Sequence, residues 1–63
     1  MKFETRKLET AIASRALTYK QFAAAAGITE KTLKQARRGA EIQPATAGRI
    51  AAALGLEMGA LIK

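Results

Sequence analysis

The chain has 63 residues, a formal net charge of +6, and neither cysteine nor histidine. This length predicts one small domain over residues 1–63, and the composition excludes disulfides, thiol chemistry and cysteine-based zinc sites, as is usual in the cytoplasm. No apolar run approaches the roughly 20 residues that span a bilayer, and no cleavable signal is evident, so we expect no membrane association and a cytoplasmic protein.

The first segment with helical periodicity lies near the N-terminus. Leu8, Ala11 and Ile12 recur at the spacing of one helix face, which predicts a packing helix over about residues 4–15. Phe3, just before this helix, either folds back onto the core or belongs to a loose arm. The sequence leaves both alternatives open.

A second, shorter helix is predicted over Tyr19–Ala26. Thr18 is placed to cap its N-terminus, and Gln21 stands where a side chain can reach back to the cap, which makes a capping box. Gly27 follows the last apolar residue, where a helix end commonly needs a left-handed backbone. The helix is therefore expected to stop at this glycine.

The same pattern repeats at once, with Thr29 as N-cap of a helix over residues 30–38 that Gly39 ends. At 3.6 residues per turn this helix has an apolar side and a polar side. The apolar side holds Thr32, Leu33 and Ala36, and the polar side holds Glu30, Lys31, Lys34, Gln35 and Arg38. Two helices joined by a tight turn, the second with an outward polar face, form a helix-turn-helix unit.

The last third of the chain predicts a fourth helix, Pro44–Leu54, after a loop over residues 40–43. Proline suits the first helical position, because no amide donor is needed there. Ala47, Ile50, Ala51 and Leu54 would form its buried stripe. After Gly55 a short fifth helix is expected over residues 58–62. The predicted fold class is all-α, a compact bundle of five short helices.

These residues resemble the bacteriophage repressor and Cro type (lambda-repressor-like) of helix-turn-helix DNA-binding domain. The resemblance covers nearly the whole chain and rests on Ala23, Gly27, Ile28, Leu33, Gly39, the run 49–56 and Leu61. The sequence departs from the family pattern at Tyr19, where the family often has glutamine, and at Arg37, where it often has glutamate. The resemblance implies a sequence-specific, Cro-like transcriptional regulator that inserts the helix of residues 30–38 into the major groove of double-stranded DNA.

The resemblance also implies which side chains meet the bases, namely Glu30, Lys31, Lys34 and Gln35. Glutamine pairs with adenine, lysine donates to guanine and glutamate accepts from cytosine. Two simpler alternatives remain, since Glu30 also suits the helix dipole and Gln35 could be merely a solvated side chain.

The phosphate contacts implied by position are Tyr19, Lys20, Arg38 and Arg37. The free amides at the start of the first motif helix would assist Tyr19 and Lys20. Tyr19 has an alternative role, with its ring capping the core. Arg37 has one as well, an ion pair with Glu9 in place of the family's glutamate arrangement.

The distribution of charge supports a polyanionic partner. Residues 30–39 carry four Lys or Arg against one Glu, half of the net charge of +6, whereas residues 40–63 are balanced. A basic stripe on one helix is the electrostatic footprint of nucleic acid. Lys2, Arg6 and Lys7 form a weaker cluster, which either approaches a flanking phosphate or is an ordinary solvated helix face.

Other functions fit the sequence less well. The chain has no Asp, no glycine-rich phosphate loop and no paired carboxylates, so we expect no enzyme, no metal, no cofactor and no small-molecule ligand. The alternative is an antitoxin-like or regulatory protein-interaction module with secondary DNA binding. RNA is disfavoured, because no exposed aromatic platform is evident.

With no second domain expected after Lys63, a Cro-like regulator in a bacterial host cell, associated with the nucleoid, fits better than a full repressor. A homodimer on DNA is possible, with Met58, Ala60 and Ile62 as candidate contacts.

Overall fold

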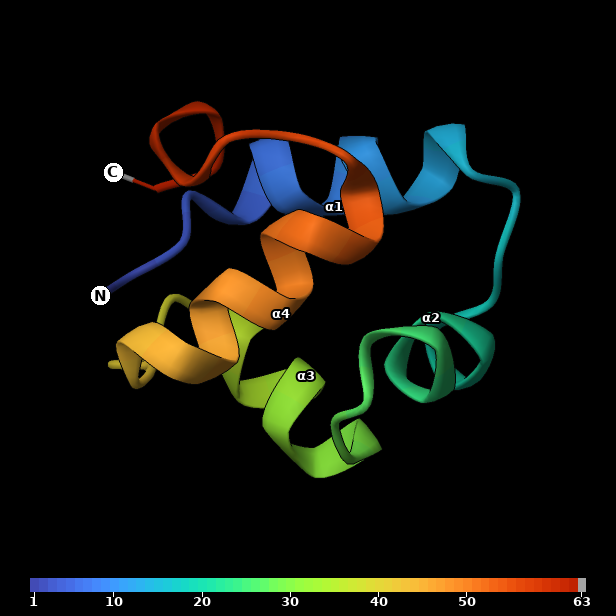
Figure 1. The fold of residues 1–63 in the computed structure, drawn as a ribbon, viewed down its shortest axis with the longest axis horizontal. Coiled ribbons are helices and arrows are strands. Elements are labelled where there is room, and N and C mark those ends of the chain that lie inside the picture. The colour runs from blue at the N-terminus through green and yellow to red at the C-terminus, as the bar shows by residue number, and fades with distance from the viewer. Residues whose placement is uncertain (63) are drawn as a thin grey trace.

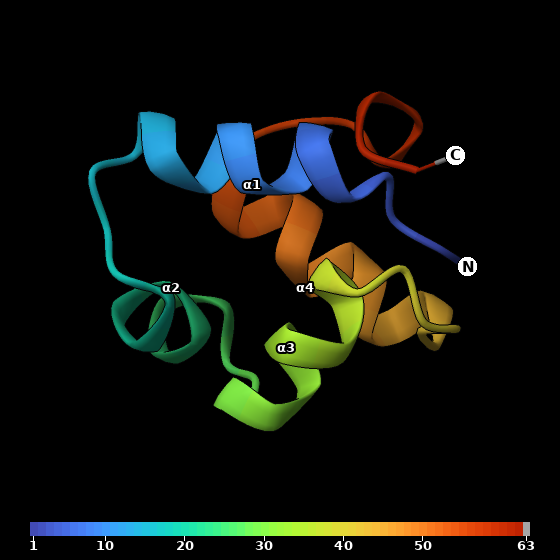
Figure 2. The same cartoon turned by 180° about the vertical axis from the view of Figure 1, so that it is seen from behind.

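The computed structural model describes residues 1–62 as an all-α fold, which confirms the predicted fold class. The elements are α1 (Thr5–Ser14), α2 (Tyr19–Ala26), α3 (Glu30–Arg37), α4 (Pro44–Leu54) and a 3-10 turn, η1 (Met58–Ala60). In Figure 1, α1 lies along the top, α2 and α3 lie at the bottom, and α4 runs between them. The view from behind in Figure 2 shows the same three levels. The two motif helices are thus held on one side of the bundle.

The prediction of a fifth helix over residues 58–62 is wrong. Only Met58–Ala60 turns, as a 3-10 helix, and the side chain of Glu57 makes no capping hydrogen bond to it. Three residues interrupted by a glycine are too few to nucleate an α-helix. Ile62 instead pairs with Phe3 in an isolated antiparallel bridge.

Three helix ends differ by one residue from the prediction, because the predicted end residues act as caps. Glu4 precedes α1, and its carboxylate accepts from the backbone N–H groups of Arg6 and Lys7 at 3.2 and 3.1 Å. Arg15 is the C-cap of α1. Arg38 is likewise the C-cap of α3.

Local capping explains why α2 and α3 begin and end where they do. The Gln21 N–H donates to Thr18 Oγ1 at 3.1 Å and the Thr18 N–H donates to Gln21 Oε1 at 2.9 Å, which confirms the capping box. Gly27 closes α2 with a left-handed φ of 74°. Thr29 Oγ1 accepts from the Thr32 N–H at 3.1 Å and so starts α3. The turn between the two helices is therefore only three residues long.

The core decides the question about Phe3, which is fully buried. The other fully buried large side chains are Leu8, Ile12, Phe22, Leu33, Ile50 and Leu61. Beside Phe3, the Glu4 N–H donates to the Leu61 carbonyl at 2.7 Å. The Ile42 N–H donates to the Met1 carbonyl at 2.7 Å, and the Ile42 side chain is buried. The N-terminus, the α3–α4 loop and the last described residues are thus fastened together at one end of the bundle.

Candidate nucleic-acid interface

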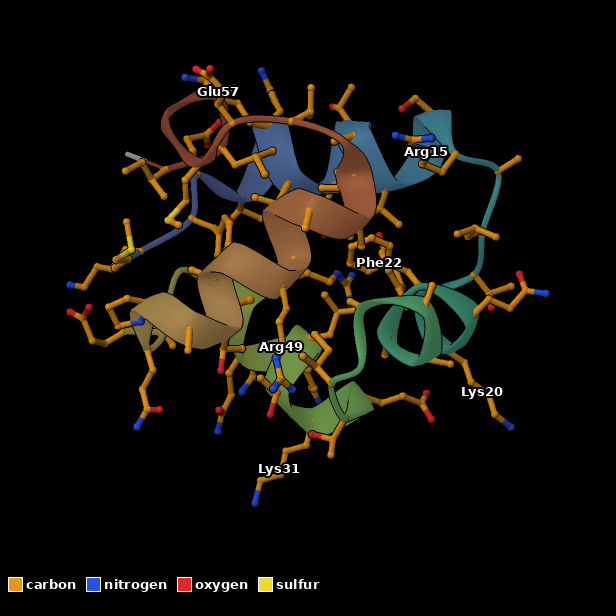
Figure 3. The ribbon with its side chains drawn as sticks, viewed as in Figure 1. Arg15, Lys20, Phe22, Lys31, Arg49 and Glu57 are labelled. Carbon is orange, nitrogen blue, oxygen red and sulfur yellow. The ribbon has the colours of Figure 1, made fainter. Side chains whose placement is uncertain are left out.

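The exposed side of α3 presents one continuous polar stripe. Lys31, Lys34, Gln35 and Arg38 are all exposed and follow the spacing i, i+3, i+4, i+7, with the exposed Glu30 beside them. Leu33 and Ala36 are buried on the opposite side of the same helix. Figure 3 shows the Lys31 side chain extending away from the body of the protein. The side chains predicted to read bases therefore share one accessible face.

The cations of this stripe make no ion pair within the part of the chain that the structure describes. Within residues 1–62 the side chains of Lys31, Lys34 and Arg38 take part in no ion pair. One carboxylate, that of Glu30, lies in the first turn of α3, where the helix dipole also favours it. The positive charge of the stripe is therefore available to a bound anion.

The start of α2 lies beside the C-terminal end of α3, because the Tyr19 ring is in contact with Arg37. Lys20 is exposed and extends into solvent (Figure 3). The Tyr19 side chain is 39% exposed, so its ring does not close the core. No acidic residue occupies the first turn of α2. This end of α2 is therefore open to an anion, although contact of Tyr19 and Lys20 with phosphate stays a prediction.

Arg37 has two intramolecular partners. Its Nε and Nη2 atoms donate to Glu9 Oε2 at 3.3 and 3.1 Å, which confirms the ion pair with α1 that was one of its two predicted roles. Its guanidinium carbon lies 3.5 Å from the centroid of the Tyr19 ring, a cation–π contact with α2. The two positions at which the sequence departs from the family pattern therefore touch each other.

Sequence reasoning assigned no role to Arg49, which braces the turn of the motif. From α4, its Nη1 atom donates to the Gly27 carbonyl at 3.3 Å (Figure 3). Its signal in the sequence was its isolation, because Arg49 is the one charged residue within Pro44–Leu54. A lone cation on an otherwise uncharged helix is well placed to serve a carbonyl of its neighbour.

The loop after α3 directly follows Arg38, one of the predicted phosphate contacts. Gly39 enters it with a left-handed φ of 79°. Glu41 is exposed, and its carboxylate accepts a hydrogen bond from the Met1 ammonium group. That hydrogen bond and the positive charge of the ammonium lower the pKa of the Glu41 carboxyl below its usual 4.5. The loop is thus tied to the N-terminus.

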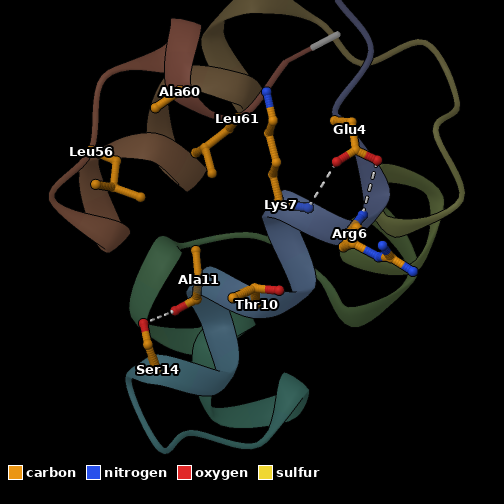
Figure 4. A pocket seen from close by; sticks show the side chains of 9 residues that line it. All are labelled: Glu4, Arg6, Lys7, Thr10, Ala11, Ser14, Leu56, Ala60 and Leu61. Atoms are coloured by element: carbon orange, nitrogen blue, oxygen red, sulfur yellow. Dashed lines mark hydrogen bonds between the residues drawn. The ribbon is translucent and has the colours of Figure 1, made fainter.

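The weaker basic cluster lies elsewhere. Arg6 and Lys7 line an open groove between α1 and the C-terminal turn, with Leu56 and Ala60 on its other side (Figure 4). Lys7 and Glu9 stand two residues apart on α1, about 200° around the helix, and Glu9 reaches α3. The groove beside Lys7 therefore faces away from the α3 stripe, which favours the solvated-face alternative for Lys7.

Two other kinds of feature are absent from residues 1–62. None of the helices described is long and apolar enough to cross a membrane. The same residues hold no group of three or more His, Cys, Asp or Glu side chains placed to bind a metal ion.

A family model described as helix-turn-helix matches residues 8–61, from the middle of α1 to the end of η1. The chain belongs to the helix-turn-helix family. It is therefore a DNA-binding domain of the kind found in transcriptional regulators. No curated protein and no solved structure matches the chain.

Proposed function

We propose that this protein is a sequence-specific, Cro-like regulator that binds a double-stranded DNA operator with α3 in the major groove. The observation that carries the proposal is the unpaired polar stripe of α3, set opposite buried Leu33 and Ala36. An α-helix with its side chains is about 10–12 Å across, and the major groove is about 12 Å wide. A helix with one face in the core and the other free to enter the groove suits that role.

Within the groove, the proposed base contacts are made from the stripe and its first turn. Gln35 would bond bidentately to adenine, Lys31 or Lys34 would donate to guanine, and Glu30 would accept from cytosine. Each well-formed pair discriminates against the wrong base by about 1–3 kcal/mol.

The proposed phosphate contacts flank the stripe. They are Tyr19 and Lys20 at the start of α2 and Arg38 at the end of α3; Arg37, the other predicted phosphate contact, has its guanidinium engaged by Glu9 and Tyr19. Together with the lysines of the stripe, four or five Lys or Arg side chains that neutralise phosphates would give a slope of log affinity against log salt of about −4 per copy, at roughly −0.9 for each phosphate.

Two copies on one operator would repress transcription by occupying adjacent half-sites, about 34 Å apart on one face of the duplex. Ala60 is exposed, and Met58 and Ile62 are partly buried, so these side chains offer a small contact between copies.

A second candidate function, protein interaction with secondary DNA binding, is favoured by one observation, the groove in which Leu56 is 43% exposed.

The test is to add a mixed-sequence DNA duplex to the ¹⁵N-labelled protein and follow every backbone amide by NMR. The proposal predicts the largest shifts at Tyr19, Lys20 and across residues 30–38, with little change at Arg6, Lys7 and Leu56. Shifts concentrated around the α1 groove, or none at low salt, would contradict it. A mixed sequence suffices, because the backbone contacts do not depend on sequence.

A further inference from the structure

One guanidinium joins three helices of this small domain. Arg37 is the last residue of α3, and it contacts Glu9 in the middle of α1 and Tyr19, the first residue of α2. Arg37 and Glu9 are both partly buried. The contact therefore lies beside the proposed interface and reaches into the body of the fold.

The geometry uses the guanidinium in two different ways. One N–H edge, through Nε and Nη2, donates to a single carboxylate oxygen of Glu9 at 3.3 and 3.1 Å. The flat face covers the Tyr19 ring at 3.5 Å from its centroid. The hydrogen bonds to Glu9 fix the plane of the Arg37 guanidinium. Because the Tyr19 ring stacks on that plane, the orientation of the ring is fixed as well.

The same geometry makes Arg37 a poor phosphate ligand. Its charge is balanced by the carboxylate at hydrogen-bond distance, so the pair presents almost no net charge to the DNA backbone. A phosphate that bound Arg37 would have to share it with Glu9. Lys20 and Arg38 carry no such partner within residues 1–62.

We infer that Arg37 is a positioning residue, which acts through Tyr19 instead of binding a phosphate itself. Held by Glu9, it fixes the Tyr19 ring at the start of α2, so that the tyrosine hydroxyl meets the DNA backbone in one orientation. This inference rests on the proposed function, because it assumes that Tyr19 faces DNA. It replaces the phosphate contact predicted for Arg37.

The decisive variant removes the carboxylate that holds Arg37, and the two possible roles of Arg37 predict opposite effects on DNA affinity. Glu9→Gln removes a negative charge and releases Arg37, so a phosphate-binding Arg37 would then bind DNA more tightly. A positioning Arg37 would lose its anchor, and affinity for a mixed-sequence duplex would fall about threefold to tenfold. The sign of this one change separates the two roles.

The salt dependence gives a second readout. Arg37→Gln should weaken binding about threefold to tenfold while leaving the slope of log affinity against log salt unchanged. The matched control, Arg38→Gln, removes the same charge from the neighbouring residue and should reduce the magnitude of the slope by about 1. A slope reduced to the same extent in both variants would overturn the inference.

A double-mutant cycle tests whether Arg37 affects DNA binding through the Tyr19 side chain. Tyr19→Phe removes the hydroxyl proposed to meet DNA, so Arg37→Gln should cost much less affinity in that background than in the wild type. Equal losses in both backgrounds would overturn the inference. Tyr19 is the one tyrosine in a chain without tryptophan, so its fluorescence reports the stack directly. We expect it to change in Glu9→Gln and Arg37→Gln but not in Arg38→Gln.

A helical circular dichroism spectrum equal to that of the wild type is the condition for comparing these variants. If an uncharged variant fails to fold, Arg37→Lys keeps the charge but not the flat face, and we expect it to weaken binding at an unchanged slope. Binding equal to that of the wild type would overturn the inference. If the wild-type protein binds no duplex even at low salt, both the inference and the proposed function are overturned. If the wild type binds DNA but the Glu9→Gln variant binds it more tightly, only the inference is overturned.

Discussion

Two surfaces of this protein carry cations without ion-pair partners among residues 1–62, and they differ in what surrounds the charge. On α3, Lys31 and Lys34 stand in a polar stripe. On the outer side of α1, Arg6 and Lys7 border a groove with the apolar Leu56, and the carboxylate of Glu4 accepts from their own backbone N–H groups. The comparison teaches that a basic cluster alone does not indicate a site for a polyanion. The polar, apolar or acidic character of the residues around the cluster has to be considered as well.

The largest expected effect comes from neutralising the α3 surface. Changing Lys31, Lys34 and Arg38 together to alanine should lower the affinity for duplex DNA by about 100-fold or more, because each removes a contact worth on the order of 1 kcal/mol or more. Fluorescence anisotropy of a labelled duplex at near-physiological salt measures it.

The matched control changes Lys2, Arg6 and Lys7 together to alanine, which removes the same charge from the basic cluster near the N-terminus. We expect about a threefold loss or less, since charges farther than about 8 Å from the duplex are largely screened at that salt. Equal losses in the two triple variants would show that DNA binding follows net charge and not the α3 stripe.

A smaller effect should divide base reading from phosphate binding within α3. Gln35→Ala should weaken binding to the preferred site by about 1–3 kcal/mol and leave other sequences nearly unchanged. Arg38→Ala should weaken binding to all sequences alike. Competition with a set of single-base variants of the preferred site measures both changes, and identical profiles would refute the assigned roles.

Stability should also differ between the two surfaces. Thr29→Ala removes the N-cap of α3, where Thr29 Oγ1 accepts from the Thr32 N–H, and should lower the free energy of unfolding by about 1 kcal/mol. The matched change Thr10→Ala lies in the α1 groove and should stay within about 0.5 kcal/mol of the wild type. Urea unfolding followed by circular dichroism compares them, and a Thr10→Ala variant as unstable as Thr29→Ala would contradict this account of the cap.

The smallest effect concerns Glu41, which ties the loop after α3 to the chain before α1. The folded state lowers the pKa of this carboxyl, so the ion pair with the Met1 ammonium stabilises the fold above pH 4.5 and stops doing so as pH falls through the lower, folded-state pKa. Urea unfolding between pH 6 and pH 2, at values chosen around the usual pKa of 4.5, should show a slightly steeper acid loss of stability for the wild type than for Glu41→Gln. Parallel curves of stability against pH for the two proteins would contradict this role of Glu41.

The helix-turn-helix unit was predictable because its rules are local. Thr18, Gly27 and Thr29 each act on a residue within three positions, so the helix ends follow from nearby residue types. Burial of Leu33 and Ala36 followed from helical periodicity alone.

The remaining features depend on partners far along the chain. Phe3 is held by a bridge to Ile62, and Arg49 reaches a carbonyl 22 residues away. Local sequence leaves Phe3 open between the core and a loose arm, and the isolation of Arg49 on α4 does not reveal which carbonyl it meets. The pair of Arg37 with Glu9 spans 28 residues, and the sequence offered it as one of two alternatives because only packing brings α1 beside α3. The stacking on Tyr19 was not predicted at all.

The most direct test of the central claim is to select a fully randomised DNA duplex pool on the purified protein at near-physiological salt and to sequence the bound fraction. The account predicts one enriched motif, recovered as a pair of half-sites about 34 Å apart if two copies bind together. Repeating the selection with Gln35→Ala should relax one position of that motif. A folded protein that enriches no sequence would contradict specific recognition by α3 and leave the basic stripe as a source of general attraction to nucleic acid.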